Sequence, residues 1–282
     1  MLSGQRPFFN VAHMANNLNN VDEFIDRGAN SVEIDVQFVN GVATEIFHGF
    51  PCDWGRWCES RTEIAEFLVK VSFRSLSMLF LDIKFDGIPL GKERVAALDL
   101  MDKLMKYFWT RTNVRTNIVI SIPYTDHENF VSGILTVLDE HPTLKSLVAI
   151  DVSQDTVHNV VRMYNKLNIS GWIGIGITNL YEALDTFSRM DCVRTLSEFI
   201  ALTWFRHDTL SNAIKERERP GSPIVKVYSW TKDWTMNMKY ALELGVDGIM
   251  TNKPEVLNKL VTNATDVRKA DVSDGLLVRY VQ

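Results

Sequence analysis

The chain has 282 residues, of which 46% are hydrophobic, and its formal net charge is −5 at pH 7. This length fits one domain of about 250 residues with a tail, and the hydrophobic content is sufficient for one large core. The pI of about 5.7 and the lack of a basic stripe argue against a nucleic-acid-binding protein. No apolar run reaches the roughly 18 residues of a membrane span, so we expect no transmembrane segment.

Apolar, β-branched segments alternate with helical patterns along the chain. We expect strands at residues 7–14, 31–38, 78–85, 116–123, 146–153, 171–178, 224–231 and 245–252. We expect helices at residues 20–27, 64–71, 93–107, 131–140, 155–167, 180–189 and 236–244. This alternation predicts an α/β fold, a single-domain (β/α)₈ TIM barrel. A doubly wound open sheet is the alternative, but it normally brings a Gly-rich nucleotide loop, which this sequence lacks.

Two segments depart from the simple alternation. Residues 36–46 predict a hairpin that turns at Asn40-Gly41 and carries His48 back over the mouth of the barrel. Residues 263–282 have a weak pattern, so we expect a barrel domain over residues 1–262 followed by a C-terminal tail. That tail either packs across the bottom of the barrel or is partly disordered.

Glu33 and Asp35 lie two residues apart in the expected strand 31–38, so both carboxylates face the same side. Two like charges this close are unfavourable unless a cation neutralises them or one of them takes up a proton. Oxygen-rich metal sites and acid/base sites are both built this way. The alternative is a strand with one solvated polar face.

Other ionisable residues fall at comparable positions. His13 ends the first apolar segment, and Asp82 and Lys84 lie two apart in an apolar strand, where charged groups rarely occur without partners. If the strands are parallel neighbours, these groups converge with Glu33, Asp35 and His48 at one mouth. Three carboxylates suit Mg²⁺, two histidines suit proton transfer and a lysine suits an anionic substrate. His13 and His48 as metal ligands are a less favoured alternative, because Mg²⁺ prefers oxygen.

Aromatic residues and cysteines near these segments leave alternatives open. Tyr228 and Trp230 could present π faces to a quaternary ammonium, or they could be ordinary barrel core. Phe50, Trp54 and Trp57 suit docking at a lipid interface, or they pack on the rim of the barrel. Cys52 and Cys58, six residues apart, fit a small disulfide-closed loop, although two free thiols fit the spacing equally.

Together these segments resemble one family, the sphingomyelinase D/phospholipase D toxins of spiders and their arachnid relatives. That family is itself akin to glycerophosphodiester phosphodiesterases, and the resemblance covers roughly residues 7–260. The matching segments are 12–14 (AHM), 28–36 (GANSVEIDV), 48–53 (HGFPCD) with Arg56 and Cys58, 81–84 (LDIK), 226–231 (KVYSWT) with Asp233, and 245–252 (GVDGIMTN). The 48–53 loop with its second cysteine is the most specific of these.

The resemblance implies a secreted enzyme that removes the head group of a choline or ethanolamine phospholipid and leaves a cyclic phosphate. It implies that Glu33, Asp35 and Asp82 hold one Mg²⁺ and that His13 and His48 form the acid/base pair. The matching pocket residues are Lys84, Tyr228, Trp230, Asp233 and Asn252, and Cys52–Cys58 matches the family's loop disulfide. The implied partner is a phospholipid at a membrane or lipoprotein surface, and we expect a monomer.

Some positions depart from the family pattern and indicate a divergent member. Trp54 stands where some members carry a third cysteine, and Ser229 stands where an aromatic residue is common. The Asn-Pro-Trp motif of the family tail is missing. Two other functions remain open: a glycerophosphodiester phosphodiesterase that uses water on small diesters, and an inactive relative that only binds lipid.

Overall fold

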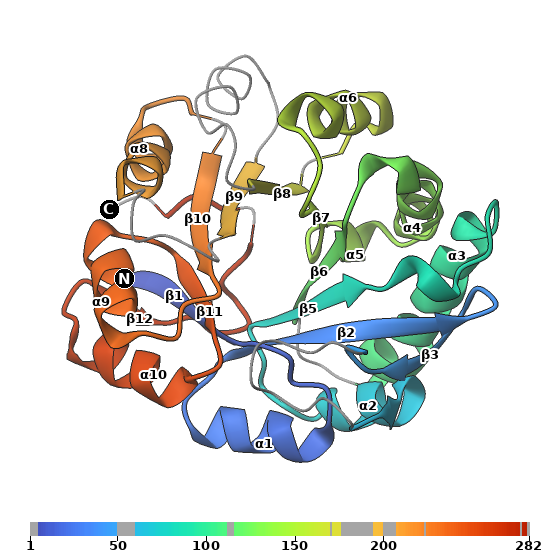
Figure 1. Ribbon diagram of the computed structural model, residues 1–282, viewed down its shortest axis with the longest axis horizontal. Coiled ribbons are helices and arrows are strands. Elements are labelled where there is room, and N and C mark those ends of the chain that lie inside the picture. The colour runs from blue at the N-terminus through green and yellow to red at the C-terminus, as the bar shows by residue number, and fades with distance from the viewer. Residues whose placement is uncertain are drawn as a thin grey trace.

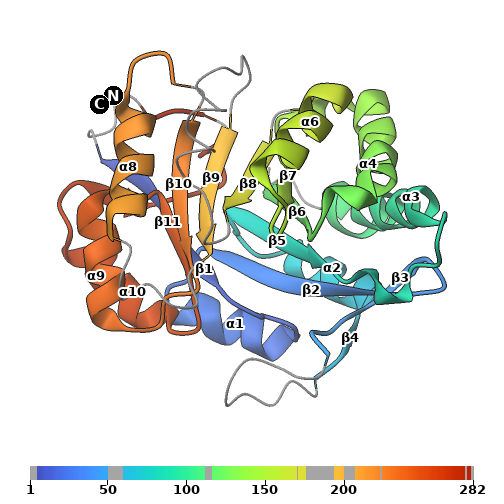
Figure 2. The same cartoon turned by 45° about the horizontal axis from the view of Figure 1, so that its top comes forward.

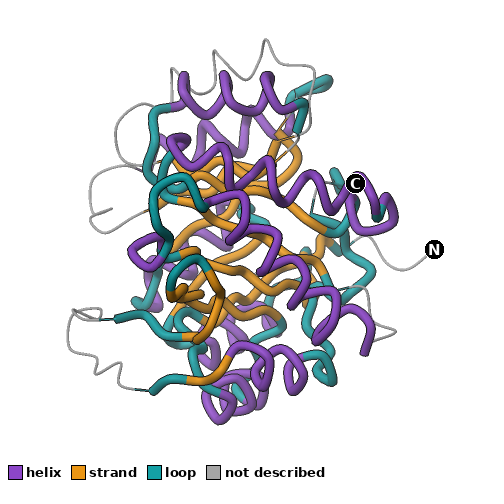
Figure 3. The backbone as a smooth tube through the Cα atoms, turned by 90° about the vertical axis from the view of Figure 1, so that its right-hand side faces the viewer, coloured by secondary structure: helices purple, strands orange, loops and turns teal. Residues whose placement is uncertain are grey.

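Parallel strands gather at the centre of the molecule and helices lie outside them (Figure 1; Figure 3). The computed structural model describes residues 5–49, 60–111, 116–169, 171–175, 194–199, 207–222, 224–276 and 278–280. Its strands are β1 (Arg6–Ala12), β2 (Ser31–Val39), β3 (Val42–Ile46), β4 (Thr62–Glu63), β5 (Met78–Ile83), β6 (Asn117–Ile122), β7 (Val148–Val152), β8 (Gly171–Ile175), β9 (Arg194–Phe199), β10 (Ile224–Trp230), β11 (Gly248–Thr251) and β12 (Val267–Lys269).

The strands close into a barrel. Within the described ranges, parallel pairings run from β1 through β2, β5, β6, β7, β8, β9, β10 and β11 back to β1. This confirms the expected single-domain α/β barrel. The sequence patterns predict each of these strands except β9, which pairs in parallel with β8 and β10.

The helices are α1 (Leu18–Asp26), α2 (Ile64–Val71), α3 (Glu93–Lys103), α4 (Glu128–Glu140), α5 (Pro142–Lys145), α6 (Val157–Leu167), α8 (His207–Glu218), α9 (Thr235–Leu244) and α10 (Pro254–Asn263). Local chemistry explains where they start and which face they bury. In α1, for example, the Asn17 side chain accepts a hydrogen bond from the Asn20 amide and caps the first turn. Val21 and Phe24, three residues apart, then bury one face of that helix. The helix expected at residues 180–189 lies outside the described residues.

The expected hairpin is present and projects from the barrel as β2 and β3 (Figure 2). Asn40 and Gly41 form its two-residue turn with φ angles of 53° and 83°, as a type I′ turn requires. Strand β4 then pairs with β3 in antiparallel fashion. The chain therefore leaves the end of β2, turns back, and brings residues 47–49 to the same end of the barrel.

The interior of the barrel is filled from below by apolar side chains. Phe9, Val11, Met78, Val119, Ala149, Tyr228 and Met250 form this inner cluster, together with Ala270 and Leu276 from the chain after α10. The backbone carbonyl of Ala270 accepts hydrogen bonds from Asn30 and Ser77, and β12 pairs with β1. The described part of the tail therefore packs across the bottom of the barrel, one of the two alternatives; the domain boundary at residue 262 stays a prediction.

Candidate active site

Strand register brings the three acidic residues together. Asp35 of β2 and Asp82 of β5 are direct partners in the parallel pairing, and Glu33 lies two residues before Asp35 on the same face. One carboxylate oxygen from each of the three residues lies within 4.8 Å of the others. No other group of this kind was found among the described His, Cys, Asp and Glu residues.

Each buried carboxylate is held by the turn after β1. The backbone N–H of Met14, a residue with a φ of 56°, donates to Oε2 of Glu33 at 2.6 Å. The side-chain amide of Asn16 donates to Oδ2 of Asp35 at 2.6 Å, and its oxygen accepts from the Asp35 backbone N–H at 2.9 Å. The segment between β1 and α1 therefore orients two of the three acidic groups before any ligand binds.

Lys84 neutralises part of the acidic cluster. Its Nζ lies 2.8 Å from Oδ1 of Asp35 and 2.6 Å from Oδ2 of Asp82. Burial alone would lower the pKa of Lys84, but the two carboxylates outweigh that effect and raise it above its ordinary value. Burial, and then repulsion from Asp35 and Asp82, holds the pKa of Glu33 well above the usual range. Burial also raises the pKa of Asp82, and Lys84 opposes part of that rise.

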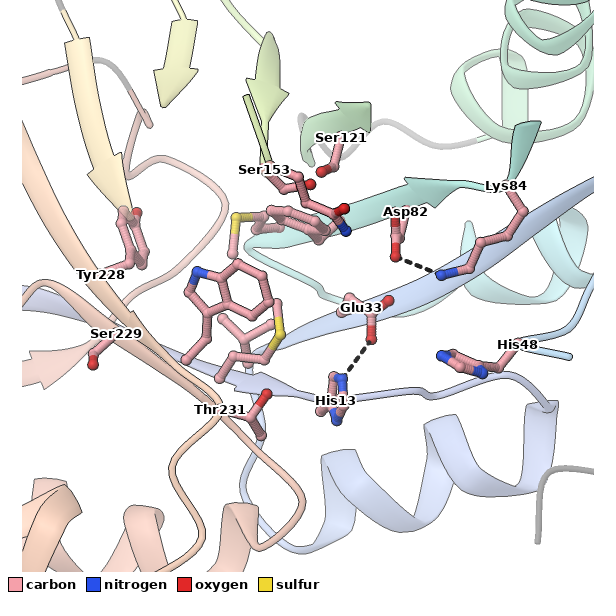
Figure 4. Close-up of a pocket in the computed structure, with 16 residues that line it drawn as sticks. His13, Glu33, His48, Asp82, Lys84, Ser121, Ser153, Tyr228, Ser229 and Thr231 are labelled. Carbon is pink, nitrogen blue, oxygen red and sulfur yellow. Dashed lines mark hydrogen bonds and ion pairs between the residues drawn. The ribbon is translucent and has the colours of Figure 1, made fainter. Parts of the chain in front are cut away.

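The two histidines border the same cavity. Figure 4 shows His13 beside Glu33, with His48 farther along the same side of the pocket. His13 Nε2 lies 3.9 Å from Glu33 Oε2, and its Nδ1 lies 3.1 Å from Oδ1 of Asn252. His48 follows β3, where Gln37 donates to the carbonyl of Phe47 at 2.8 Å and to that of His48 at 3.4 Å.

Asp233 lies behind the His13–Asn252 contact. Its Oδ2 accepts from Asn252 Nδ2 at 2.7 Å, and its Oδ1 accepts from the Asn252 backbone N–H at 2.7 Å and from Thr251 Oγ1 at 3.0 Å. Because a carboxylate only accepts, Asn252 must turn its amide nitrogen to Asp233 and its oxygen to His13. His13 therefore donates from Nδ1, and Nε2 is the nitrogen on the side of Glu33.

The cavity enclosed by these groups has a volume of about 320 Å³. Charged and polar groups line its open side, and apolar groups line the rest. The lining residues are Val11, His13, Glu33, His48, Met78, Phe80, Asp82, Lys84, Ser121, Ser153, Gln154, Tyr228, Ser229, Trp230, Thr231 and Met250. A polar mouth over an apolar interior of this size can hold a small head group while its anionic phosphate lies against the charged rim.

The structure brings most of the expected site residues to this cavity. His13, Glu33, His48, Asp82, Lys84, Tyr228 and Trp230 line it, whereas Asp35, Asp233 and Asn252 contact lining residues from behind. Tyr228 is buried and packs on Phe9 with ring centroids 5.7 Å apart. Cys52 and Cys58, with Phe50, Trp54 and Trp57, lie outside the described residues, so their expected roles stay predictions.

Sequence reasoning missed several residues that shape the site. Asn16 and Gln37 support the carboxylates and the His48 loop from positions that no motif marks. Met78, Phe80 and Ser121 had a usable signal, because they lie at even spacing from Asp82 along β5 or opposite it on β6. Extending the two-residue period down each strand would have found them.

The fold and the site thus define a class of proteins: α/β barrels that gather acidic and imidazole groups at the carboxyl ends of parallel strands. The chain matches the family model described as Dermonecrotic toxin SPH over residues 3–198 and 200–275. It therefore belongs to that family, in agreement with the resemblance of its motifs.

Individual relatives agree with this assignment. Dermonecrotic toxin StSicTox-betaIF1 of Sicarius terrosus is 34% identical, covering 92% of this chain and 93% of the relative. Dermonecrotic toxin LiSicTox-alphaII1 of Loxosceles intermedia is 31% identical, covering 92% and 83% respectively. Among solved structures, a phosphodiesterase from Oleispira antarctica, in complex with the product sn-glycerol-3-phosphate, superimposes with a TM-score of 0.56 at 13% identity. It covers 92% of this chain and 98% of its own, and this likeness shows a shared fold. No described helix is both long and apolar enough to cross a membrane.

Proposed function

We propose that this chain is a secreted, Mg²⁺-dependent phosphodiester lyase of the phospholipase D/sphingomyelinase D type. It would release choline or ethanolamine from a phospholipid and leave a cyclic phosphate. The observation that carries this proposal is the cluster of Glu33, Asp35 and Asp82, with ligand oxygens within 4.8 Å of one another, at a cavity that His13 and His48 also border. Family membership supports the same reaction.

The charges of the cluster suit a divalent cation. Three carboxylates and the Lys84 ammonium sum to a formal charge of −2 when all are ionised. All three acidic donors are oxygens, which Mg²⁺ prefers, and the raised pKa of Glu33 shows that the cluster holds unfavourable negative charge on its own. Glu33, Asp35 and Asp82 would hold the ion, which when bound would offset the charge of the phosphate.

The chain's own residues would position the diester and move its protons. Lys84 would attract the anionic phosphate to the rim of the cavity. A hydroxyl of the lipid would attack phosphorus, forming one P–O bond while the bond to the head-group oxygen breaks. One imidazole would accept the proton of the attacking hydroxyl and the other would protonate the departing alkoxide, each transfer being typically worth about 10²–10⁴ in rate. The His13–Asn252 contact supports proton exchange at Nε2 of His13.

The head group would enter the apolar part of the cavity. Trp230 and Tyr228 line it and could contact a quaternary ammonium through their rings, at about 0.5–2 kcal/mol per contact. Burial raises the pKa of Tyr228, which keeps its hydroxyl neutral. The relatives are named dermonecrotic toxins, which supports a secreted protein with a Cys52–Cys58 disulfide that acts as a monomer on lipid surfaces.

A lipid panel tests the proposal directly. The protein is incubated with choline and ethanolamine forms of sphingolipids and lysoglycerolipids, with Mg²⁺ or with EDTA, and the products are read by ³¹P NMR. We expect a cyclic phosphate signal that EDTA abolishes and Mg²⁺ restores. A linear phosphate product, together with turnover of glycerophosphocholine, would instead identify a water-using glycerophosphodiester phosphodiesterase. Lipid binding without any turnover would identify an inactive lipid-binding relative.

Histidine variants test the assignment of roles. His13→Ala and His48→Ala should each lower kcat at least about 10²-fold, because each removes one proton transfer. Exposed His158 on α6 provides the matched control, and His158→Ala should retain full activity. Thermal melts establish that each variant is folded. Retention of turnover in either cavity variant would refute the acid/base pair.

A further inference from the structure

Large apolar side chains that are exposed to solvent are concentrated at one end of the barrel. Nine such side chains occur among the described residues, and seven of them lie between the carboxyl end of a strand and the first turn of the helix or strand that follows. We call these seven the mouth surface: Val39, Val42, Leu90, Val95, Tyr124, Trp234 and Met236. The other two, Phe73 and Val278, lie on segments at the opposite end. Carboxyl ends of parallel strands share one side of a barrel, so this distribution is polarised.

Trp234 and Met236 lie closest in sequence to the cavity. They follow Trp230 and Thr231, which line it, and their side chains are 59% and 66% exposed. Tyr124 follows β6, which lies four strands from β10 in the sheet order and therefore across the barrel. Its hydroxyl donates to Oε1 of Gln154, another lining residue, at 2.8 Å. Exposed side chains thus stand on opposite sides of the cavity opening.

We infer that the mouth surface, through Trp234 and Met236 with Tyr124 opposite, docks this protein on the surface of a zwitterionic phospholipid bilayer. The inference rests on the proposed function, because a phospholipid must reach the cavity from above. Trp and Tyr combine an apolar ring with a polar group and suit the boundary between head groups and acyl chains.

A bilayer fits this surface better than a protein partner does. The exposed side chains lie on separate loops around the opening of the cavity, and a bilayer contacts them all without needing a matched shape. A protein seated across the opening would close the cavity to substrate. The net charge of −5 argues that attraction to anionic lipid does not drive adsorption, so apolar contact should dominate.

The test measures binding without turnover. The protein is mixed in EDTA with phosphatidylcholine vesicles and separated by flotation, so that lipid binding is scored in the absence of metal. Trp234→Ser/Met236→Ser should lower the partition coefficient at least about tenfold, or about 1.4 kcal/mol. Phe73→Ser is the matched control, since Phe73 is exposed as much as Met236, at 66%, and lies at the opposite end. It should bind as the unaltered chain does.

Activity and salt provide the discriminating arms. The double variant should lose turnover on vesicles in proportion to its lost binding, yet keep turnover on a short-chain substrate below its critical micelle concentration. Raising the salt concentration should leave vesicle binding unchanged, because exposed charges are screened but apolar contact is not. The single Met236→Ser variant, checked by thermal melting, replaces the double variant if that fails to fold.

Three results would overturn the inference: equal binding by the double variant, equal loss in Phe73→Ser, or release of the protein by salt. A dimer that the double variant dissociates in light scattering would also overturn it, because the surface would then join two copies of the chain. If vesicle binding depends on Trp234 and Met236 while no diester is turned over, the proposed reaction fails and the docking surface stands.

Discussion

Asp233 and Asn252 are joined by a 2.7 Å hydrogen bond from the Asn252 amide nitrogen to the Asp233 carboxylate, and this contact decides which atom Asn252 presents to His13. A carboxylate cannot donate a hydrogen bond, so the amide oxygen must face Nδ1 of His13. The imidazole tautomer is thereby fixed from a residue that does not itself line the cavity. Asp233 is thus better described as a residue that positions His13 than as one that contacts the head group.

Asp233→Ala should therefore impair turnover through His13. Without the carboxylate, Asn252 can rotate its amide and His13 can exchange tautomers. We expect kcat to fall by roughly 10- to 100-fold, less than the loss of a whole proton transfer, with KM little changed. The pH profile of kcat/KM, measured for the variant and for the unaltered chain, should change shape. Exposed Asp271 provides the control, and Asp271→Ala should leave the profile as it was. An unchanged profile in Asp233→Ala, or a change confined to KM, would show that Asp233 binds substrate instead.

Lys84→Met should have opposite effects on metal binding and on turnover. Lys84 occupies one oxygen of Asp35 and one of Asp82, so it competes with a bound cation for both. Its removal should tighten Mg²⁺ binding in a calorimetric titration, while kcat/KM falls because the phosphate loses a cationic partner. Lys103, which pairs with Asp99 at 2.5 Å, provides a lysine control. Weaker Mg²⁺ binding by Lys84→Met would contradict this account.

Glu33 should make both metal affinity and stability depend on pH. Its pKa in the folded protein is raised above the ordinary value of 4.5, first by burial and then by Asp35 and Asp82. Below that raised pKa a proton competes with the cation, so Mg²⁺ binding should tighten as the pH rises through it.

The stability of the metal-free protein should change in the opposite sense. Between its ordinary and raised pKa values, Glu33 keeps a proton in the folded state that it has lost in the unfolded state. The unfolding free energy should therefore fall as pH rises across that window. Thermal melts in EDTA and in Mg²⁺ across this range measure both effects, and Glu33→Gln should flatten the dependence. A melting temperature in EDTA that rises across the window would refute this interpretation.

Asp247→Ala should destabilise the fold away from the cavity. Asp247 is 2% exposed and pairs with Arg217 at 2.5 Å and with Arg6 at 3.4 Å, both largely buried. It also accepts from the Val227 backbone N–H at 2.7 Å. Removing it leaves two buried guanidinium groups without this partner, at a cost of about 3–5 kcal/mol in urea unfolding. Asp139, in an exposed pair with Lys145, is the control and should cost less than about 1 kcal/mol on truncation.

The strands and the gathering of ionisable groups could be read from the chain because both depend on local periodicity. Glu33, Asp35, Asp82 and Lys84 alternate along apolar strands, and parallel strands must end on one side, so their convergence follows. The Asn40-Gly41 turn was predictable for a similar reason, since its backbone angles select those two residues. Strand β9 was not predicted, because residues 194–199 (RTLSEF) carry no clear apolar run.

The amino-acid sequence by itself determined the barrel, its strands and the kinds of chemical group at its open end, since side-chain alternation and turn chemistry act within a few residues. Only the tertiary structure decided how those groups engage one another. Lys84 bridges Asp35 and Asp82, Asn16 reaches Asp35, and Asp233 turns toward Asn252, because each side chain settles on partners from segments far away along the chain. Such choices depend on burial and on competition for hydrogen bonds in three dimensions, which no local pattern records.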